Sequence, residues 1–269
     1  YKFHSLQKFK NISYTDSFNN KLEYKYLPIE SVAIYVPGST ASYPSSVLMN
    51  AIPAIVAGVK RIIMLNPGYK GKLNPAVLYA AKKCKINEIY SIGGPSAIAA
   101  VAYGTKKINK VSKIVGPGNI YVAAAKKEVF GDVGVEGMIA GPSEVTVVGD
   151  RFSNPEWIAS DLIGQAEHDE LAQCILISKS KDLIKKVKIE ISKQLKKIPR
   201  RSIAKKSLIR NGILIHISSD KEIIKVVNRI APEHLELNVK NHKSFINKIK
   251  NAGSICLGKY AVMAMTDYN

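Results

Sequence analysis

The sequence lacks the features that would assign it to a membrane, to an exported class or to a standard phosphate-binding class. No apolar run approaches the roughly 20 residues of a membrane-spanning helix. No basic, apolar and cleavable signal segment opens the chain. Neither GxGxxG at a first strand–helix turn nor GxxxxGKS/T occurs. We therefore expect a cytoplasmic protein that has no membrane partner and uses neither standard phosphate cradle.

Cysteine is scarce, and its occurrences do not suit a bridge or a metal cluster. Cys84, Cys174 and Cys256 are odd in number, far apart and without CxxC spacing, and each lies in an apolar context. A metal cluster or a disulfide framework would need closely spaced or paired cysteines. We expect three buried free thiols.

Acidic residues are few: 21 Asp+Glu stand against 40 Lys+Arg, which gives a net charge of +19. The densest basic stretch is 179–206, where apolar residues keep a helical repeat and leave the lysines for the outer face; these residues are Leu183, Ile184, Val187, Ile189, Ile191 and Leu195. A nucleic-acid binder would interleave arginines and aromatics with this charge. We expect a solvated face and no nucleic-acid partner; polyanion binding is the alternative, and it predicts steeply salt-dependent binding to duplex DNA.

Short β-rich runs alternate with longer helical ones from residue 31 onward. This alternation predicts an α/β protein with two packed Rossmann-like lobes, whose mainly parallel sheets are covered by helices. The expected lobes are residues 35–142, and residues 1–34 plus 143–269. Strands are expected at 32–36, 61–65, 88–92, 113–115, 144–148, 173–178, 213–218 and 254–258, and helices at 45–58, 75–84, 95–103, 120–129, 154–169, 220–230 and 242–250 and within the lysine-rich stretch.

Several loops are rich in Gly, Pro, Ser and Asn. Small residues let the backbone approach a ligand closely, and the helix that follows offers free N–H groups. In open α/β sheets such ligand loops lie at the carboxyl ends of the strands, where we expect these loops. They read VPGSTASYPSS, IGGPS, VGPGN and AGPSE.

Two polar pairs could carry chemistry. Gln165 and His168 are three residues apart, so on a helix they share a face, and an amide oxygen with an imidazole can hold zinc. Two such residues are more often a hydrogen-bonded face. Glu233 and His234 are adjacent and could handle two different protons in one pocket; the alternative is that His234 is a hydrogen-bonded capping residue.

Taken together, the loops and polar pairs indicate a protein family far more specifically than any one of them does. In order and spacing the segments resemble the motifs of the histidinol dehydrogenase family from about Tyr35 to Tyr268; they read IYVPGSTASYPSSVLMNAIPA, GGPSAIAAVAYGT, KIVGPGN, AGPSEV, DLIGQAEHD, APEHLEL, NAGSICLG and TDY. The resemblance implies a zinc-containing, NAD-dependent homodimer with intertwined subunits. Its reaction would oxidise the small molecule L-histidinol to L-histidine through the aldehyde in two hydride transfers, within histidine biosynthesis.

The resemblance also implies the roles of individual residues. Tyr35, Ser96 and Asn119 match NAD contacts in the first lobe, the NAD-binding one. The second lobe would hold zinc and substrate: Gln165, His168 and Asp267 match zinc ligands that also contact the substrate, and Ser143 matches a further substrate contact. Glu233 and His234 match the acid–base pair, and His234 also touches the substrate.

Departures from the family pattern occur at Ser39, Ser96 and Thr266, where the family usually has Gly, Gln and Gly. The chain starts at Tyr1 and stops at Asn269, so we expect a fragment without the N-terminal region and the C-terminal tail that supplies the fourth zinc ligand, nearly inactive by itself. The alternatives are a relative that acts on another small amino alcohol or polyol, and a degenerate inactive fragment.

Overall fold

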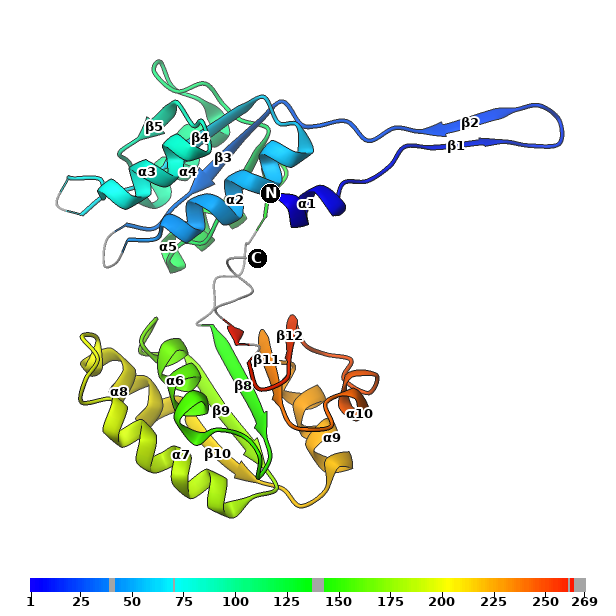
Figure 1. Ribbon diagram of the computed structural model, residues 1–269. Helices are drawn as coiled ribbons and strands as arrows, with labels where there is room; N and C mark the ends of the chain where they lie inside the picture. The colour runs from blue at the N-terminus through cyan, green and yellow to red at the C-terminus, as the bar shows by residue number, and fades with distance from the viewer. Residues whose placement is uncertain (39–41, 70, 137–142, 261, 264–269) are drawn as a thin grey trace. The chain divides into compact units, whose positions relative to one another are not determined.

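The computed structural model describes residues 1–38, 42–69, 71–136, 143–260 and 262–263. The chain divides into two units, residues 1–140 and 141–269 (Figure 1). This division differs from the expected one, which placed residues 1–34 with the second lobe. Residues 31–34 belong to strand β3 at the centre of the first sheet, and so lie in the first unit.

The first unit contains a five-stranded parallel sheet in the order β5-β4-β3-β6-β7. Helices cover both faces, with α2 and α3 on one and α4 and α5 on the other (Figure 1). The strands are β3 (Ser31–Tyr35), β4 (Arg61–Leu65), β5 (Glu88–Tyr90), β6 (Lys113–Val115) and β7 (Gly134–Val135), and the helices are α2 (Pro44–Ala57), α3 (Pro75–Lys83), α4 (Gly94–Tyr103) and α5 (Ile120–Glu128). The alternation read from the sequence is confirmed here; only β7 was not expected.

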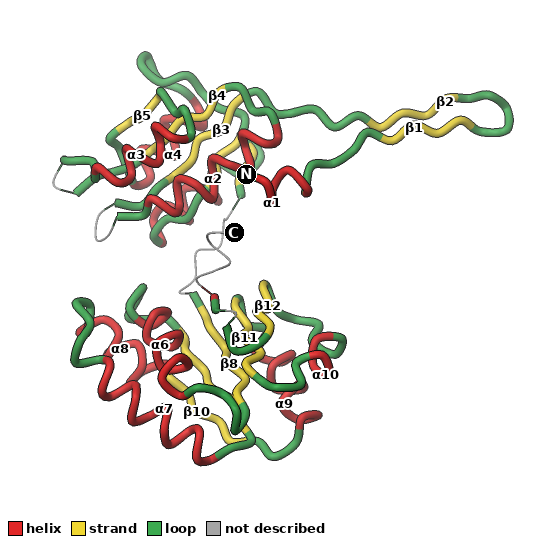
Figure 2. Tube along the Cα trace, viewed as in Figure 1, coloured by secondary structure: helices red, strands yellow, loops and turns green. Residues whose placement is uncertain are grey.

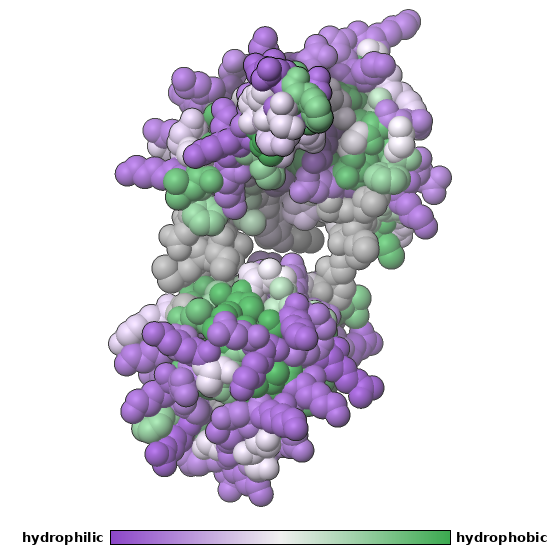
Figure 3. Space-filling model, turned by 90° about the vertical axis from the view of Figure 1, so that its right-hand side faces the viewer, coloured by the Kyte–Doolittle hydropathy of each residue, from purple (hydrophilic) through white to green (hydrophobic). Residues whose placement is uncertain are grey.

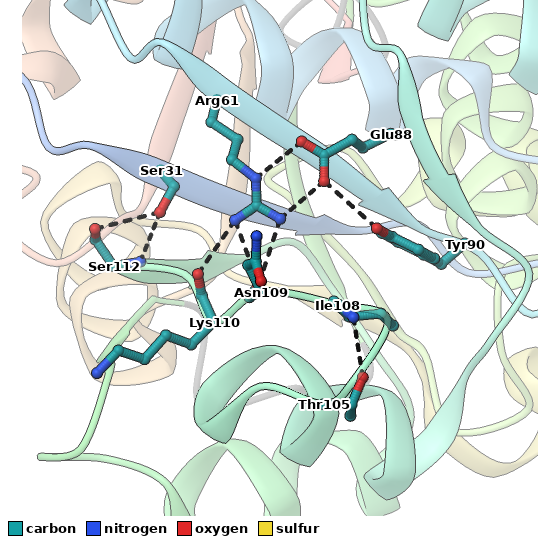
Figure 4. Close-up of polar contacts among 9 residues, drawn as sticks. All are labelled: Ser31, Arg61, Glu88, Tyr90, Thr105, Ile108, Asn109, Lys110 and Ser112. Atoms are coloured by element: carbon teal, nitrogen blue, oxygen red, sulfur yellow. Dashed lines mark hydrogen bonds and ion pairs between the residues drawn. The ribbon is translucent and has the colours of Figure 1, made fainter.

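An ion pair ties together the amino edge of this sheet (Figure 4). The Arg61 guanidinium, at the start of β4, donates two hydrogen bonds of 2.8 Å to the Glu88 carboxylate, at the start of β5. It also donates to the backbone carbonyls of Asn109 and Lys110 at 3.3 and 3.1 Å. The bonds from Arg61 hold the pKa of Glu88 below its usual value. Arg61 therefore fixes the starts of β4 and β5 to the segment that precedes β6.

The second unit contains a second five-stranded parallel sheet, in the order β10-β9-β8-β11-β12. Helices α6, α7 and α8 cover one face, and α9 and α10 the other. The strands are β8 (Glu144–Gly149), β9 (Gln173–Ser178), β10 (Gly212–His216), β11 (His234–Asn238) and β12 (Ser254–Leu257), and the helices are α6 (Pro155–Ala166), α7 (Lys181–Gln194), α8 (Arg201–Asn211), α9 (Asp220–Ile230) and α10 (Lys243–Ile246). The α/β class with two mainly parallel, helix-covered sheets is thus confirmed.

The lysine-rich stretch is two helices rather than one. Helix α7 ends at Gln194 and α8 begins at Arg201, with Pro199 between them. Most of the predicted apolar face of α7 packs on the core, but Ile189 is 65% exposed. Hydrophilic side chains cover most of the face seen in Figure 3. In the described part of the chain, no helix has the length and apolarity to cross a membrane.

The first 30 residues contain helix α1 (Lys2–Leu6) and a separate antiparallel hairpin, β1 (Ile12–Thr15) and β2 (Lys21–Tyr24) (Figure 2). The turn forms because the Asp16 carboxylate accepts the N–H groups of Phe18 and Asn20, each at 2.8 Å. The hairpin pairs with no other strand of the described chain.

The three cysteines are buried free thiols, as expected. Burial raises the pKa of Cys174 to about 12 and that of Cys256 to about 11, so both stay protonated and unreactive.

Candidate active site

The first sheet has a reversal of strand order between β3 and β6, because β4 and β5 lie on one side of β3 and β6 and β7 on the other. A crevice for ligands opens at such a point, outside the carboxyl ends of the strands. Tyr35 ends β3, and Asn119 caps helix α5 just after β6. The GPGN loop follows β6 as expected, and the contacts of Tyr35 and Asn119 with NAD stay predictions.

Tyr35 lies beneath the loops rather than open to solvent. It is 4% exposed, and its hydroxyl accepts the N–H of Gly94 at 3.1 Å. Asn119 is exposed, and its side-chain oxygen accepts the N–H of Val122 at 3.1 Å. Tyr35 therefore fixes the GGPS loop, while Asn119 stands at the surface where a ligand could reach its amide N–H₂.

A buried lysine holds the loop between β6 and α5 in place. Lys126 is 1% exposed, and its ammonium donates to the backbone carbonyl of Gly116 and, at 3.1 Å, to that of Glu136. Burial lowers the pKa of Lys126 to about 8. The side chain thus ties the ends of β6 and β7 together under the GPGN loop. Nothing in the sequence distinguishes Lys126 from the other lysines of this basic chain.

Ser96 is exposed in the first turn of α4, where a side chain can reach a ligand on the sheet edge. We expect Ser96→Gln to lower the Kd for NAD several-fold, because the longer amide can add about one hydrogen bond to the cofactor. Isothermal titration of the complete protein with NAD measures this change.

Ala99 provides a matched control for Ser96. It is exposed on the same helix, one turn further from the sheet edge. Ala99→Gln adds the same side chain where the cofactor is not expected, so its Kd for NAD should equal that of the parent protein. An unchanged Kd in Ser96→Gln would contradict the role of Ser96.

In the second sheet the motif segments precede strands, as the sequence indicated for APEH but not for AGPSE. AGPSE leads into β8, APEH leads into β11 and NAGS leads into β12, so all three lie at the amino ends of parallel strands. At the carboxyl edge, Asp150 accepts the N–H of Lys240 at 2.8 Å, and Ser153 donates to the carbonyl of Asn238. These bonds join the segments that follow β8 and β11. The carboxyl-edge expectation is therefore wrong for AGPSE, whereas APEH enters a strand as expected.

Strand pairing brings Glu233 and His234, the predicted acid–base pair, together with two other motifs. Residue 145 of β8 and residue 254 of β12 both pair with His234. The Glu144 N–H donates to Glu233 Oε2 at 3.2 Å, and His234 Nδ1 lies 2.9 Å from Ser254 Oγ. His234 Nε2 lies 3.7 Å from Glu233 Oε1, with the His234 side chain 19% and the Glu233 side chain 52% exposed. The pair is thus held from both sides and accessible to a small molecule.

A glycine allows the NAGS loop to approach this pair. A Cβ on Gly253 would lie 2.7 Å from the Glu233 carbonyl oxygen. With no side chain there, the Gly253 N–H donates to the Pro232 carbonyl at 3.0 Å and the Ser254 N–H to the Glu233 carbonyl at 2.9 Å. Ser254 was not among the predicted site residues, although its place in the NAGS motif could have indicated it.

Gln165 and His168 do not share a helix. Helix α6 ends at Ala166, so His168 lies in the turn beyond it, and the argument from helical spacing is wrong. The two stay close through the backbone, since the His168 N–H donates to the Gln165 carbonyl at 3.2 Å. The Gln165 side chain is 1% exposed and its amide nitrogen has no partner among the described residues, whereas the His168 side chain is exposed.

These two residues fit a zinc ion in their donor types, because the Gln165 amide oxygen and an imidazole nitrogen of the exposed His168 can both coordinate the metal. Asp267, the third predicted ligand, lies outside the described residues, as do Ser39 and Thr266. Within the described part of the chain, no group of three or more His, Cys, Asp or Glu side chains could hold a metal. Ser143 is half-buried just before β8, and its carbonyl accepts the Gln173 N–H at 3.2 Å.

The comparisons with known proteins agree with these motifs. The family profile described as Histidinol dehydrogenase matches residues 1–269. The chain is 82% identical over 269 residues to histidinol dehydrogenase of Pelagibacter ubique and 54% identical over 241 residues to that of Listeria monocytogenes. These alignments cover 100% and 90% of this chain, but 63% and 56% of the relatives.

A solved structure of the family matches this chain closely. The crystal structure of histidinol dehydrogenase from Elizabethkingia anophelis matches with a TM-score of 0.94 and 39% identity, over 99% of this chain and 62% of that one. The chain therefore spans a little under two thirds of the length of its relatives. On the profile match and these identities, the chain belongs to the histidinol dehydrogenase family.

Proposed function

We propose that the complete protein oxidises L-histidinol to L-histidine through L-histidinal, in the last steps of histidine biosynthesis, with NAD and zinc. The observation that carries this proposal is the assembly of Glu233, His234 and Ser254 at the amino edge of the second sheet. The turn at residues 165–168 precedes β9 and so leads into the same edge. The buried free thiols suit the reducing cytoplasm, which we propose as its location.

NAD would lie at the strand-order reversal of the first sheet, where small-residue loops and the start of helix α5 meet. Tyr35, Ser96 and Asn119 would hold it. When bound, it would accept one hydride in each of the two oxidations. The chain itself would contribute a fixed binding loop, because Lys126 holds the Gly116 carbonyl and Asn119 caps the helix that follows.

His234 would act as the base that takes the alcohol proton. If its Nδ1–H donates to Ser254 Oγ, the Ser254 hydroxyl can donate in turn to the Glu233 carbonyl, 3.5 Å away. This chain of donors leaves the lone pair of His234 Nε2 free to accept a proton. The Ser254 contact is compatible with this tautomer, which is the one that the reaction would require.

Glu233 would activate the water that hydrates the aldehyde before the second oxidation. Its carboxylate is half exposed, and one oxygen accepts the Glu144 N–H. The other oxygen faces His234 Nε2 and is available to a water. Adjacent residues would thus serve the two proton transfers, each within reach of the same substrate carbon.

Gln165, His168 and Asp267 would hold zinc, with Ser143 contacting the substrate. When bound, the zinc would orient the substrate's imidazole and amine. The same residues would serve a relative that oxidises another small amino alcohol or polyol. Initial rates of NADH formation by the complete protein, measured with L-histidinol and with other amino alcohols and polyols, separate the two. A higher kcat/KM for another substrate would replace our proposal with the alternative.

We also propose a homodimer, supported by the hairpin. Cross-strand pairing places four apolar residues on one face, Ile12, Tyr14, Leu22 and Tyr24, each about three-fifths exposed. The other face carries polar residues only, Ser13, Thr15, Lys21 and Glu23. An isolated two-stranded hairpin is only marginally stable in water. This apolar face therefore needs a surface to pack against, and a second copy of the chain would provide it.

Placing a charge on that face should dissociate the dimer. We expect Tyr14→Lys to shift the complete protein toward monomer in sedimentation velocity, with a rise of at least about tenfold in the dimer Kd, because an unpaired ammonium is costly to bury. Ser13→Lys, on the polar face of the same strand, is the matched control and should stay dimeric. Equal behaviour of the two variants would show that the hairpin face is not the interface.

A further inference from the structure

Two carboxylic acids lie together on the face of the second sheet that α6 covers. Glu236 is 1% exposed and follows His234 by two residues on β11, so the two side chains lie on the same face of the sheet. Asp161 lies on α6 one helical turn before Gln165. Each acid thus shares an element with a residue of the candidate active site.

The two acids contact each other. Their side chains are close enough to hydrogen-bond, yet Asp161 Oδ2 and Glu236 Oε2 are buried oxygens without a donor among the described residues. Two carboxylates cannot satisfy each other, because both are acceptors only. One proton held between them supplies the missing donor and halves the buried charge.

The surroundings favour such a proton. Burial raises the pKa of Asp161 to about 6 and that of Glu236 to about 8, the latter also through the charge of Asp161. Cys256 pairs with Glu236 across β11 and β12, and it stays a neutral thiol that supplies no counter-charge. Near neutral pH the pair therefore holds one proton between the two carboxylates.

Glu236 also holds a third segment. Its Oε1 accepts the N–H of Met263 at 2.7 Å, and the Met263 side chain packs on the core cluster that includes α6. Asp267, a proposed zinc ligand, follows four residues later. The two acids thus connect three parts of the chain: β11, which carries His234; α6, which carries Gln165; and residue 263.

We propose that Asp161 and Glu236 are positioning residues that share one proton and lock α6, β11 and residue 263 together, setting the spacing of the zinc and substrate groups. This inference rests on the proposed function for its zinc readout. The lock itself is a property of the metal-free chain and can be measured apart from it.

The experiment compares three variants of the complete protein. Glu236→Gln keeps an oxygen for the Met263 N–H and an N–H₂ donor for Asp161, so both contacts survive. Glu236→Leu removes both and strands the Asp161 carboxylate. Thr146→Val is the control: Thr146 is fully buried on β8, and its hydroxyl has no partner among the described residues.

The first readout is hydrogen exchange of the Met263 amide in metal-free protein. We expect exchange at least about tenfold faster in Glu236→Leu, the effect of one lost buried hydrogen bond, and little change in Glu236→Gln or Thr146→Val. The same exchange rate in Glu236→Leu as in the parent protein would overturn the lock, whatever the protein's activity.

The second readout is the zinc Kd from competition with a chromophoric chelator. We expect at least about tenfold weaker binding in Glu236→Leu and rescue to within about threefold in Glu236→Gln. Weak binding in both Glu236 variants would show that charge matters rather than the shared proton, and parent-like binding in Glu236→Leu would refute the positioning role. A parent protein that binds no zinc refutes the proposed zinc requirement and the positioning role, while the exchange rates still decide the lock.

Discussion

Replacement of His234 by asparagine is expected to lower kcat for L-histidinol oxidation by about 10²- to 10⁴-fold, the usual contribution of a positioned proton acceptor. Asparagine keeps a donor for Ser254 Oγ, 2.9 Å from the present Nδ1, but has no lone pair of suitable basicity at the Nε2 position. The loss should therefore fall on kcat, with a smaller change in KM.

A second histidine in the same unit provides the control. His216 lies exposed on β10, and its Nε2 contacts the Lys179 carbonyl at 3.2 Å, away from the motif-bearing amino edge of β11. His216→Asn should leave kcat within about twofold of the parent value, as surface changes usually do. A His234→Asn protein that keeps more than about a tenth of the parent kcat would refute the role of His234 as base.

Replacement of Gly116 by alanine should destabilise the first unit and weaken NAD binding together. Gly116 has φ +99°, and an added Cβ would lie 2.3 Å from the Tyr35 carbonyl oxygen. The strained backbone and the clash together cost about 2–4 kcal/mol in the free energy of unfolding. Hydrogen exchange of the β3 and β6 amides, and NAD titration, measure the two effects.

Gly131 separates the clash from the backbone strain. It also has a left-handed φ, +106°, but an added Cβ would meet nothing within 4 Å. Gly131→Ala should therefore destabilise the unit by about 1–3 kcal/mol and leave NAD binding unchanged. If the two alanine variants lose stability equally, the close approach of the GPGN loop to Tyr35 has no energetic importance.

Much of the fold follows from local patterns. The buried runs at β3, β4, β8 and β9 are continuous and β-branched, which is typical of central parallel strands. The start of α6 was also readable, because the Asn154 side chain caps it ahead of Pro155. Its end at Ala166 was not, since neither glycine nor proline follows.

The site was harder to predict than the fold. Motif order indicated Glu233 and His234 at the entry of a strand, but it did not indicate which strands lie beside that one. The pairing of β11 between β8 and β12 decides this, and it depends on contacts distant in sequence. The contact between Asp161 and Glu236 was not predicted either, because charged residues in an amphipathic pattern are normally assigned to the solvent-exposed surface.

The central claim is that this chain forms part of an NAD- and zinc-dependent enzyme that oxidises L-histidinol. The most direct test is the amount of NADH formed per L-histidinol consumed by the complete protein, with and without a chelator. We expect two NADH per L-histidinol, lost on chelation and restored by added zinc. A single NADH per substrate, or full turnover in the presence of the chelator, would contradict it.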